Sequence, residues 1–124
     1  MTASTDVVLL AVEWQPRALI RAQLIEQGLD VIATDTWSKM RRQLRPGTKP
    51  RLAIVDLKGL PDPLSVLRDL RVLMKPDRVL VLTATATVSR PAVEQFGFHV
   101  VSRPITIDRV VHAAARVLRQ PTVE

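Results

Sequence analysis

The chain of 124 residues contains no cysteine, four glycines and two histidines, His99 and His112. Without cysteine it can form neither disulfides nor thiolate metal sites. The two histidines lie far apart in the sequence, which argues against a zinc site or a histidine-based catalytic triad. The sequence contains no glycine-rich phosphate loop, and four glycines do not supply a dinucleotide fingerprint. We therefore expect a binding or signalling module and not an enzyme.

Long hydrophobic runs are also missing. The apolar runs are far shorter than the roughly 20 residues that cross a bilayer. Residues 1–6 contain no basic segment followed by an apolar one, which is the pattern of a secretory signal peptide. We therefore expect a cytoplasmic protein without a membrane partner. Because 47% of the residues are hydrophobic, we expect one globular domain over 1–124 with its core at about 7–119.

The net charge of +6 is carried mostly by arginine. Such a charge permits an acidic partner or nucleic acid, but scattered cations are more typical of solvated helix faces. The densest basic segment, 41–51, holds five cations that could contact phosphates. It carries no recognisable DNA-binding motif, and only Trp37 lies near for base stacking. Nucleic-acid binding through 41–51 is therefore a lesser alternative.

The segment Leu52–Asp56 organises the chain, because four apolar residues end there in a carboxylate. Such a short, continuous apolar run is typical of a strand buried on both faces in a parallel sheet. Asp56 would then lie at the carboxyl end of its strand. In open α/β sheets, ligands bind at that edge.

Strand patterns alternate with helix patterns along the whole chain. Thr36, Ser89 and Thr106 each fit the N-cap of a helix, and Gly28 fits a helix end. The predicted strands are 7–12, 29–33, 52–56, 79–82 and 100–101. This alternation, with right-handed crossovers, predicts a doubly wound, flavodoxin-like (βα)5 fold: a five-stranded parallel sheet in the order 2-1-3-4-5 with helices on both faces.

Polar side chains follow several of these strands. Asp56 ends the third strand, Thr83 follows the fourth, and Arg103 with Pro104 follows the fifth. A carboxylate can accept a phosphoryl group as a nucleophile. A hydroxyl and a cation can then hold the phosphate oxygens. The predicted edge therefore gathers groups suited to phosphoryl chemistry.

In these features, from Val7 to about Arg119, the chain resembles the receiver domain of bacterial two-component response regulators. The resemblance rests on the strand ending at Asp56, the pair Thr83-Ala84, the pair Arg103-Pro104 and the position of Gly28. It implies that Asp56 accepts a phosphoryl group from a histidine kinase at a magnesium ion. It also implies that Thr83 is the switching hydroxyl, that Arg103 replaces the family's lysine, and that the bond to Pro104 is cis.

The sequence departs from this family at the first strand. The acidic pair that binds magnesium in receivers falls on Ala11 and Val12, and neither side chain offers the oxygen ligands that magnesium needs. We therefore expect weak magnesium binding. The neighbouring Glu13 could join Asp56 as a ligand, although a one-residue offset at a strand end directs it elsewhere. Because no acidic pair competes with Asp56 for Arg103, these two residues should form an ion pair that lowers the pKa of Asp56.

Two functional hypotheses follow. The first is an atypical receiver, or pseudo-receiver, that acts as a protein-interaction module with impaired magnesium-dependent phosphorylation. Its partner would be a histidine kinase, an output domain or another signalling protein, or a second copy bound through the fourth helix, fifth strand and fifth helix. The alternative is a working receiver phosphorylated on Asp56, in which Glu13 or water replaces the acidic pair.

Overall fold

The computed structural model describes residues 5–45, 50–83 and 88–121. The strands are β1 (Val7–Leu10), β2 (Val31–Thr34), β3 (Leu52–Asp56), β4 (Val79–Leu82) and β5 (His99–Val101). The helices are α1 (Trp14–Glu26), α2 (Trp37–Gln43), α3 (Pro63–Leu73), α4 (Arg90–Glu94) and α5 (Ile107–Arg119), with a 3₁₀ turn at Pro76–Arg78. Ala84 and part of the basic segment 41–51, namely 46–49, lie outside the described residues.

All strand pairs are parallel, and the order in the sheet is β2-β1-β3-β4-β5. The predicted flavodoxin-like fold is therefore confirmed. β3 lies at the centre between β1 and β4, and all five of its residues are buried. This position explains why its sequence is a continuous apolar run and not an alternating one.

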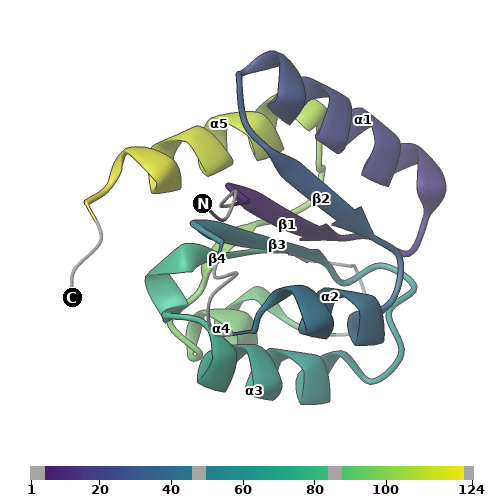
Figure 1. Ribbon diagram of the computed structural model, residues 1–124. Helices are drawn as coiled ribbons and strands as arrows, with labels where there is room; N and C mark the ends of the chain where they lie inside the picture. Colours follow the sequence, from purple (N-terminus) through teal and green to yellow (C-terminus); the bar gives the residue numbers. More distant parts are fainter. Residues whose placement is uncertain (1–4, 46–49, 84–87, 122–124) are drawn as a thin grey trace.

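Helices cover both faces of the sheet: α1 and α5 lie on one face, and α2, α3 and α4 lie on the other (Figure 1). Successive residues of a strand point to opposite faces. Val7 and Leu9 of β1 accordingly pack in the core with α1 and α5, whereas Val8 and Leu10 pack in the core with α2 and α3. The sheet thus separates two apolar cores.

The predicted helix caps are confirmed. The hydroxyls of Thr36, Ser89 and Thr106 accept hydrogen bonds from the backbone N–H groups of Lys39, Ala92 and Arg109, respectively. Gly28 has φ +85° and follows the end of α1, where its N–H donates to the carbonyl of Ile25. A positive φ of this kind is typical of glycine in the position after a helix C-cap.

Three strands differ from their predicted bounds, and in β5 the difference is a single residue, because that strand begins at His99 and not at Val100. β1 ends at Leu10 and not at Val12. The carbonyls of Ala11 and Val12 instead accept hydrogen bonds from the Arg17 guanidinium at 2.8 Å and 3.1 Å. β2 begins at Val31 and not at Leu29, because the Leu29 N–H bonds back to α1. The Ala11 N–H still donates to the Thr34 carbonyl of β2 at 3.1 Å, so backbone pairing continues for one residue beyond Leu10.

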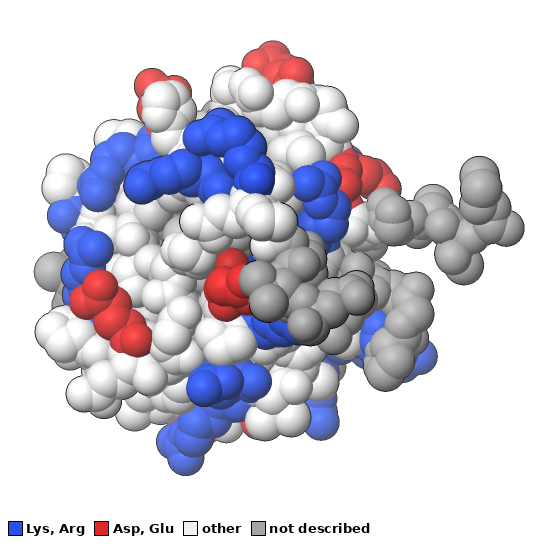
Figure 2. Space-filling view, turned by 90° about the vertical axis from the view of Figure 1, so that its left-hand side faces the viewer, with Lys and Arg blue, Asp and Glu red and all other residues white. Residues whose placement is uncertain are grey.

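None of the helices among the described residues is long and apolar enough to cross a bilayer. Figure 2 shows the side of the molecule at which the strands begin. Lys and Arg side chains lie there in separate groups with acidic side chains between them (Figure 2). This arrangement is typical of solvated surfaces and differs from the continuous basic stripe of a nucleic-acid interface.

Candidate functional site

The predicted site residues Asp56 and Thr83 lie together at the carboxyl edge of the sheet. Asp56 is the last residue of β3 and pairs in register with Leu82, which directly precedes Thr83. Both side chains are buried, with 8% and 7% of their surface exposed. The Thr83 hydroxyl donates a long hydrogen bond of 3.5 Å to the carbonyl of Val101. The sequence therefore located this pair of groups correctly.

Burial raises the pKa of Asp56 above its ordinary value. The backbone N–H of Lys58, which donates to Asp56 Oδ1 at 3.0 Å, and the charge of Arg103 lower the pKa in part, while the charge of Glu13 raises it further. The predicted lowering is therefore wrong. Removing a carboxylate from water disfavours its charged form, and here that effect outweighs the nearby cations.

The predicted ion pair between Asp56 and Arg103 is also wrong, because these two described residues form none. Arg109 donates to the carbonyls of Ser102 and Pro104 and so holds the loop after β5 on α5. Arg103 stays exposed on this loop, where its guanidinium remains hydrated. The Arg103-Pro104 bond is cis, as the resemblance implied.

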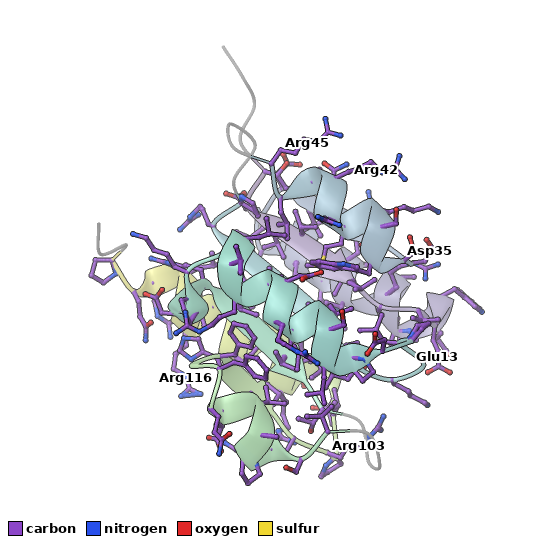
Figure 3. All side chains as sticks on the ribbon, turned by 90° about the horizontal axis from the view of Figure 1, so that it is seen from below. Glu13, Asp35, Arg42, Arg45, Arg103 and Arg116 are labelled. Carbon is purple, nitrogen blue, oxygen red and sulfur yellow. The ribbon has the colours of Figure 1, made fainter. Side chains whose placement is uncertain are left out.

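A different cation lies beside Asp56. Lys58 Nζ pairs with Glu13 Oε1 at 3.1 Å, and this bridge joins the loop after β1 to the loop after β3. Glu13 thus bonds to a lysine, and Figure 3 shows Glu13 at the periphery of the molecule. Lys58 was not among the site residues predicted from the sequence. Its place two residues after Asp56 was the available signal.

The structure places Ala11 and Val12 in apolar surroundings. Ala11 is fully buried. Val12 packs near Gly59 and lines a pocket of 440 Å³ between α2 and α3, together with the apolar residues Trp37 and Leu60. The two carbonyls of this segment already accept hydrogen bonds from Arg17, a second residue that sequence reasoning missed. At the end of β1 the side chains are therefore apolar, and the backbone carbonyls bond to a cation.

These residues do not fit a magnesium ion. Magnesium requires near-octahedral oxygen ligation, usually with one or two carboxylates and several waters. Asp56 supplies one carboxylate, Glu13 is paired with Lys58, and Arg17 brings a further positive charge to the same edge. Within the described ranges, no group of three or more His, Cys, Asp or Glu side chains could hold a metal ion.

In the described part of the basic segment 41–51, two arginines bond to groups of the domain itself. Arg51 pairs with Asp6 at 3.3 Å and donates to the carbonyl of Leu118. Arg42 Nε donates to the carbonyl of Ser38 at 3.5 Å. Figure 3 shows Arg42 and Arg45 on one side of the molecule and Arg103 and Arg116 on others. The arginines thus surround the domain.

Replacing Asp56 by asparagine should stabilise the protein at pH 7 by about 1–2 kcal/mol, because it removes a buried charge and keeps an acceptor for the Lys58 N–H. Since the folded-state pKa is raised, folding binds a proton between the ordinary pKa of about 3.9 and the folded value, so stability falls as pH rises through this window. The stability gain should therefore shrink as the pH is lowered toward 4. Urea unfolding at both pH values measures it.

The exposed Asp62 at the start of α3 offers a matched control. Asp62→Asn should change the free energy of unfolding by less than about 0.5 kcal/mol at either pH. If Asp56→Asn were neutral at pH 7, or gained stability only in acid, burial would not govern the Asp56 carboxyl.

Comparisons with known proteins identify the fold. No protein-family model matches the chain, and no curated protein matches its sequence. Among solved structures, a CheY-like response regulator receiver domain protein from Methanospirillum hungatei superposes with a TM-score of 0.76 at 15% identity, covering 94% of each chain. A response regulator receiver protein from Pseudomonas putida gives 0.75 at 17% identity, covering 94% of this chain and 99% of its own.

NtrX from Brucella abortus also superposes, with a TM-score of 0.76 at 20% identity over 94% of this chain. The match covers 27% of the NtrX chain, so the same fold forms one part of that longer protein. These solved structures share the arrangement of strands and helices described above. The fold of this chain is therefore the fold of response regulator receiver domains.

Proposed function

We propose that this chain is an atypical receiver that acts as a protein-interaction module in two-component signalling, with impaired magnesium-dependent phosphorylation. One observation carries the proposal: the position of the family's acidic pair holds Ala11 and Val12, and the cations of Arg17 and Lys58 lie at the same edge. Asp56 keeps its place at the end of β3, but burial raises its pKa, and the groups around it offer a metal ion few further oxygen ligands.

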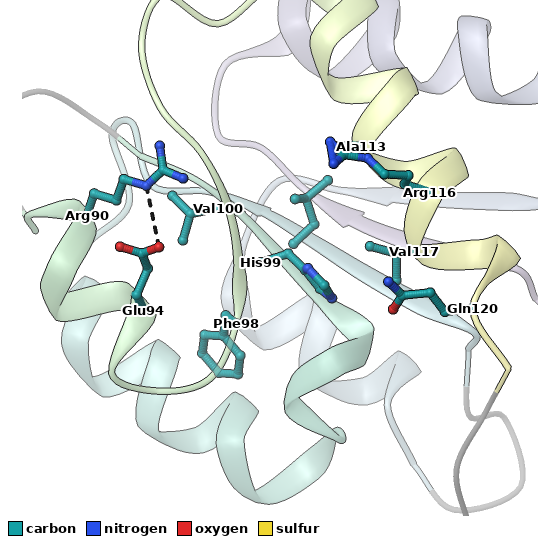
Figure 4. Close-up of a pocket in the computed structure, with 10 residues that line it drawn as sticks. Arg90, Glu94, Phe98, His99, Val100, Ala113, Arg116, Val117 and Gln120 are labelled. Carbon is teal, nitrogen blue, oxygen red and sulfur yellow. Dashed lines mark ion pairs between the residues drawn. The ribbon is translucent and has the colours of Figure 1, made fainter.

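The partner surface that fits this proposal is formed by α4, β5 and α5. A pocket of 390 Å³ opens there between α4 and α5, with Arg90 and Arg116 among its lining residues (Figure 4). Val100, at the position where many receivers carry an aromatic residue, also lines it. An adjoining pocket of 370 Å³ shares Arg90 and Arg116 and adds Arg109.

Three arginines on one face suit an acidic partner surface, because opposite charges steer association and fix its register. Glu94, which pairs with Arg90 at 3.6 Å, and Asp108 offset part of this charge, but the three arginines outnumber these two carboxylates. In a second copy bound to the same face, arginines would oppose arginines. We therefore favour a different signalling protein here, either a histidine kinase or an output domain.

Intact-mass measurement after incubation with acetyl phosphate and magnesium tests the proposal. We expect the mass of the wild-type protein to stay unchanged, as it should in Asp56→Asn. A receiver known to be phosphorylated under the same conditions serves as the positive control. A gain of one phosphoryl group by the wild type, lost in Asp56→Asn, would contradict the proposal and support the working phosphoacceptor.

A further inference from the structure

Exposed apolar side chains gather on α1. Among the described residues, five large hydrophobic side chains are exposed, and three of these lie on this helix: Trp14 at 71%, Leu19 at 47% and Ile25 at 42%. Such a concentration on one helix is unusual for a surface that faces only water, and exposed patches of this kind mark interaction sites. Tryptophan in particular is enriched among residues that dominate binding energy.

Two of these three residues, Trp14 and Ile25, lie with two exposed alanines on a continuous strip along the outer side of α1. Trp14, Ala18, Ala22 and Ile25 follow at helical spacings of four, four and three, which places them on one face. All four are exposed, whereas Ile20 and Leu24 on the opposite side are buried against the sheet. The strip therefore has a large residue at each end and two small residues in the middle.

We propose that this strip is where two copies of the chain pair, with their α1 helices antiparallel. A two-fold axis requires each residue to meet its counterpart reciprocally. An axis near the middle of α1 places Trp14 opposite Ile25 of the second copy, and Ala18 opposite Ala22. The small central residues let the helices approach closely, and the two large pairs pack at either end. This inference does not depend on the proposed function.

Charge favours this face over others for self-association. Two chains of net charge +6 repel each other wherever cations gather. The strip itself is uncharged, and it is bordered by one cation, Arg21, and one anion, Glu26. Arg17 points inward and donates to the carbonyls of Ala11 and Val12. Higher salt should strengthen the pairing, because it screens the overall repulsion.

The size of the strip predicts a weak dimer. A helix of 13 residues is about 20 Å long, so one helix pair buries less than the roughly 800 Å² per partner of a standard interface. The strip also begins next to the candidate site, because Trp14 follows Glu13, whose carboxylate pairs with Lys58. We therefore expect association in the range of about 10 μM to 1 mM, with each end of the interface near the Asp56 of one copy.

Sedimentation velocity of the full chain over about 10 μM to 1 mM tests the proposal. The weight-average mass should rise with concentration from 13.8 kDa toward twice that value. Ile25→Glu should keep the protein monomeric at every concentration. Val72→Glu, at an 85% exposed apolar residue of α3, is the matched control and should associate like the wild type. Circular dichroism of both variants reports that the fold is retained.

A mixing experiment tests the antiparallel orientation. Trp14→Glu and Ile25→Lys should each be monomeric alone, whereas an equimolar mixture should recover dimers, because the introduced glutamate meets the introduced lysine across the interface. A wild type that is monomeric near 1 mM would overturn the proposal, and so would equal loss of association in Val72→Glu. Failure of the mixture to associate, while the wild type dimerises, would overturn the antiparallel pairing.

Discussion

Replacing Arg78 by alanine should lower the free energy of unfolding by about 2–4 kcal/mol. Only 6% of Arg78 is exposed, and its guanidinium donates to the carbonyls of Val117 at 3.0 Å and Gln120 at 2.6 Å. These carbonyls lie at the end of α5, where the helix dipole favours a cation, and the Val117 carbonyl also accepts from the backbone N–H of Gln120 at 3.1 Å. Alanine would remove both charge-assisted hydrogen bonds of the buried guanidinium and would also leave a cavity. Urea unfolding at pH 7 measures the loss.

Arg51→Ala is the matched control for this prediction. Arg51 also donates to a carbonyl in the last turn of α5, that of Leu118 at 3.2 Å, but its side chain is 53% exposed. Water can replace an exposed donor, so the loss should stay below about 1 kcal/mol. Similar small losses in both variants would show that burial does not make the Arg78 contacts important.

The double substitution Ala11→Asp with Val12→Asp should make magnesium binding much stronger than in the wild type. It adds two carboxylates at the end of β1, next to Asp56, and so supplies the oxygen ligands that magnesium prefers. We expect at least a tenfold stronger response to magnesium than in the wild type. Without metal, three carboxylates at one buried edge repel each other, and the double variant should be less stable than the wild type.

Unfolding in the presence of magnesium measures this gain. A ligand that binds only the folded state stabilises it by RT ln(1 + [L]/Kd), which is about 1.4 kcal/mol at ten times Kd. The double variant should therefore gain stability with magnesium, and the added Asp56→Asn change should reduce the gain. Sodium chloride of equal ionic strength is the control for screening. Equal magnesium stabilisation of the wild type would contradict the account.

The fold could be predicted because its signals are local and mutually consistent. The apolar run of Leu52–Asp56 predicted a strand buried on both faces, and the three hydroxyl caps marked where helices begin. The end of β1 was harder to predict from the sequence. There the guanidinium of Arg17, six residues after Ala11, donates hydrogen bonds to the carbonyls of Ala11 and Val12. A hydrogen bond from a following helix leaves no mark in the hydrophobic pattern.

The candidate site was predicted only in part. The ends of parallel strands meet at one edge, so the neighbourhood of Asp56 and Thr83 followed from strand order alone. Loop side chains are different, because their direction depends on contacts such as the Arg109 bonds that hold the loop carrying Arg103. The burial of Arg78 could not be predicted either, because arginine is rarely buried and the neighbouring residues give no sign that its side chain contacts α5.

Magnesium titration of the wild-type protein, followed by the backbone amide resonances of Glu13, Asp56 and Lys58, tests most directly whether the metal site has been lost. We predict that millimolar magnesium shifts these resonances no more than sodium chloride of the same ionic strength, and that the shifts do not saturate. Saturating shifts at all three amides, absent in Asp56→Asn, would show an ion held at the end of β3 and would contradict the account.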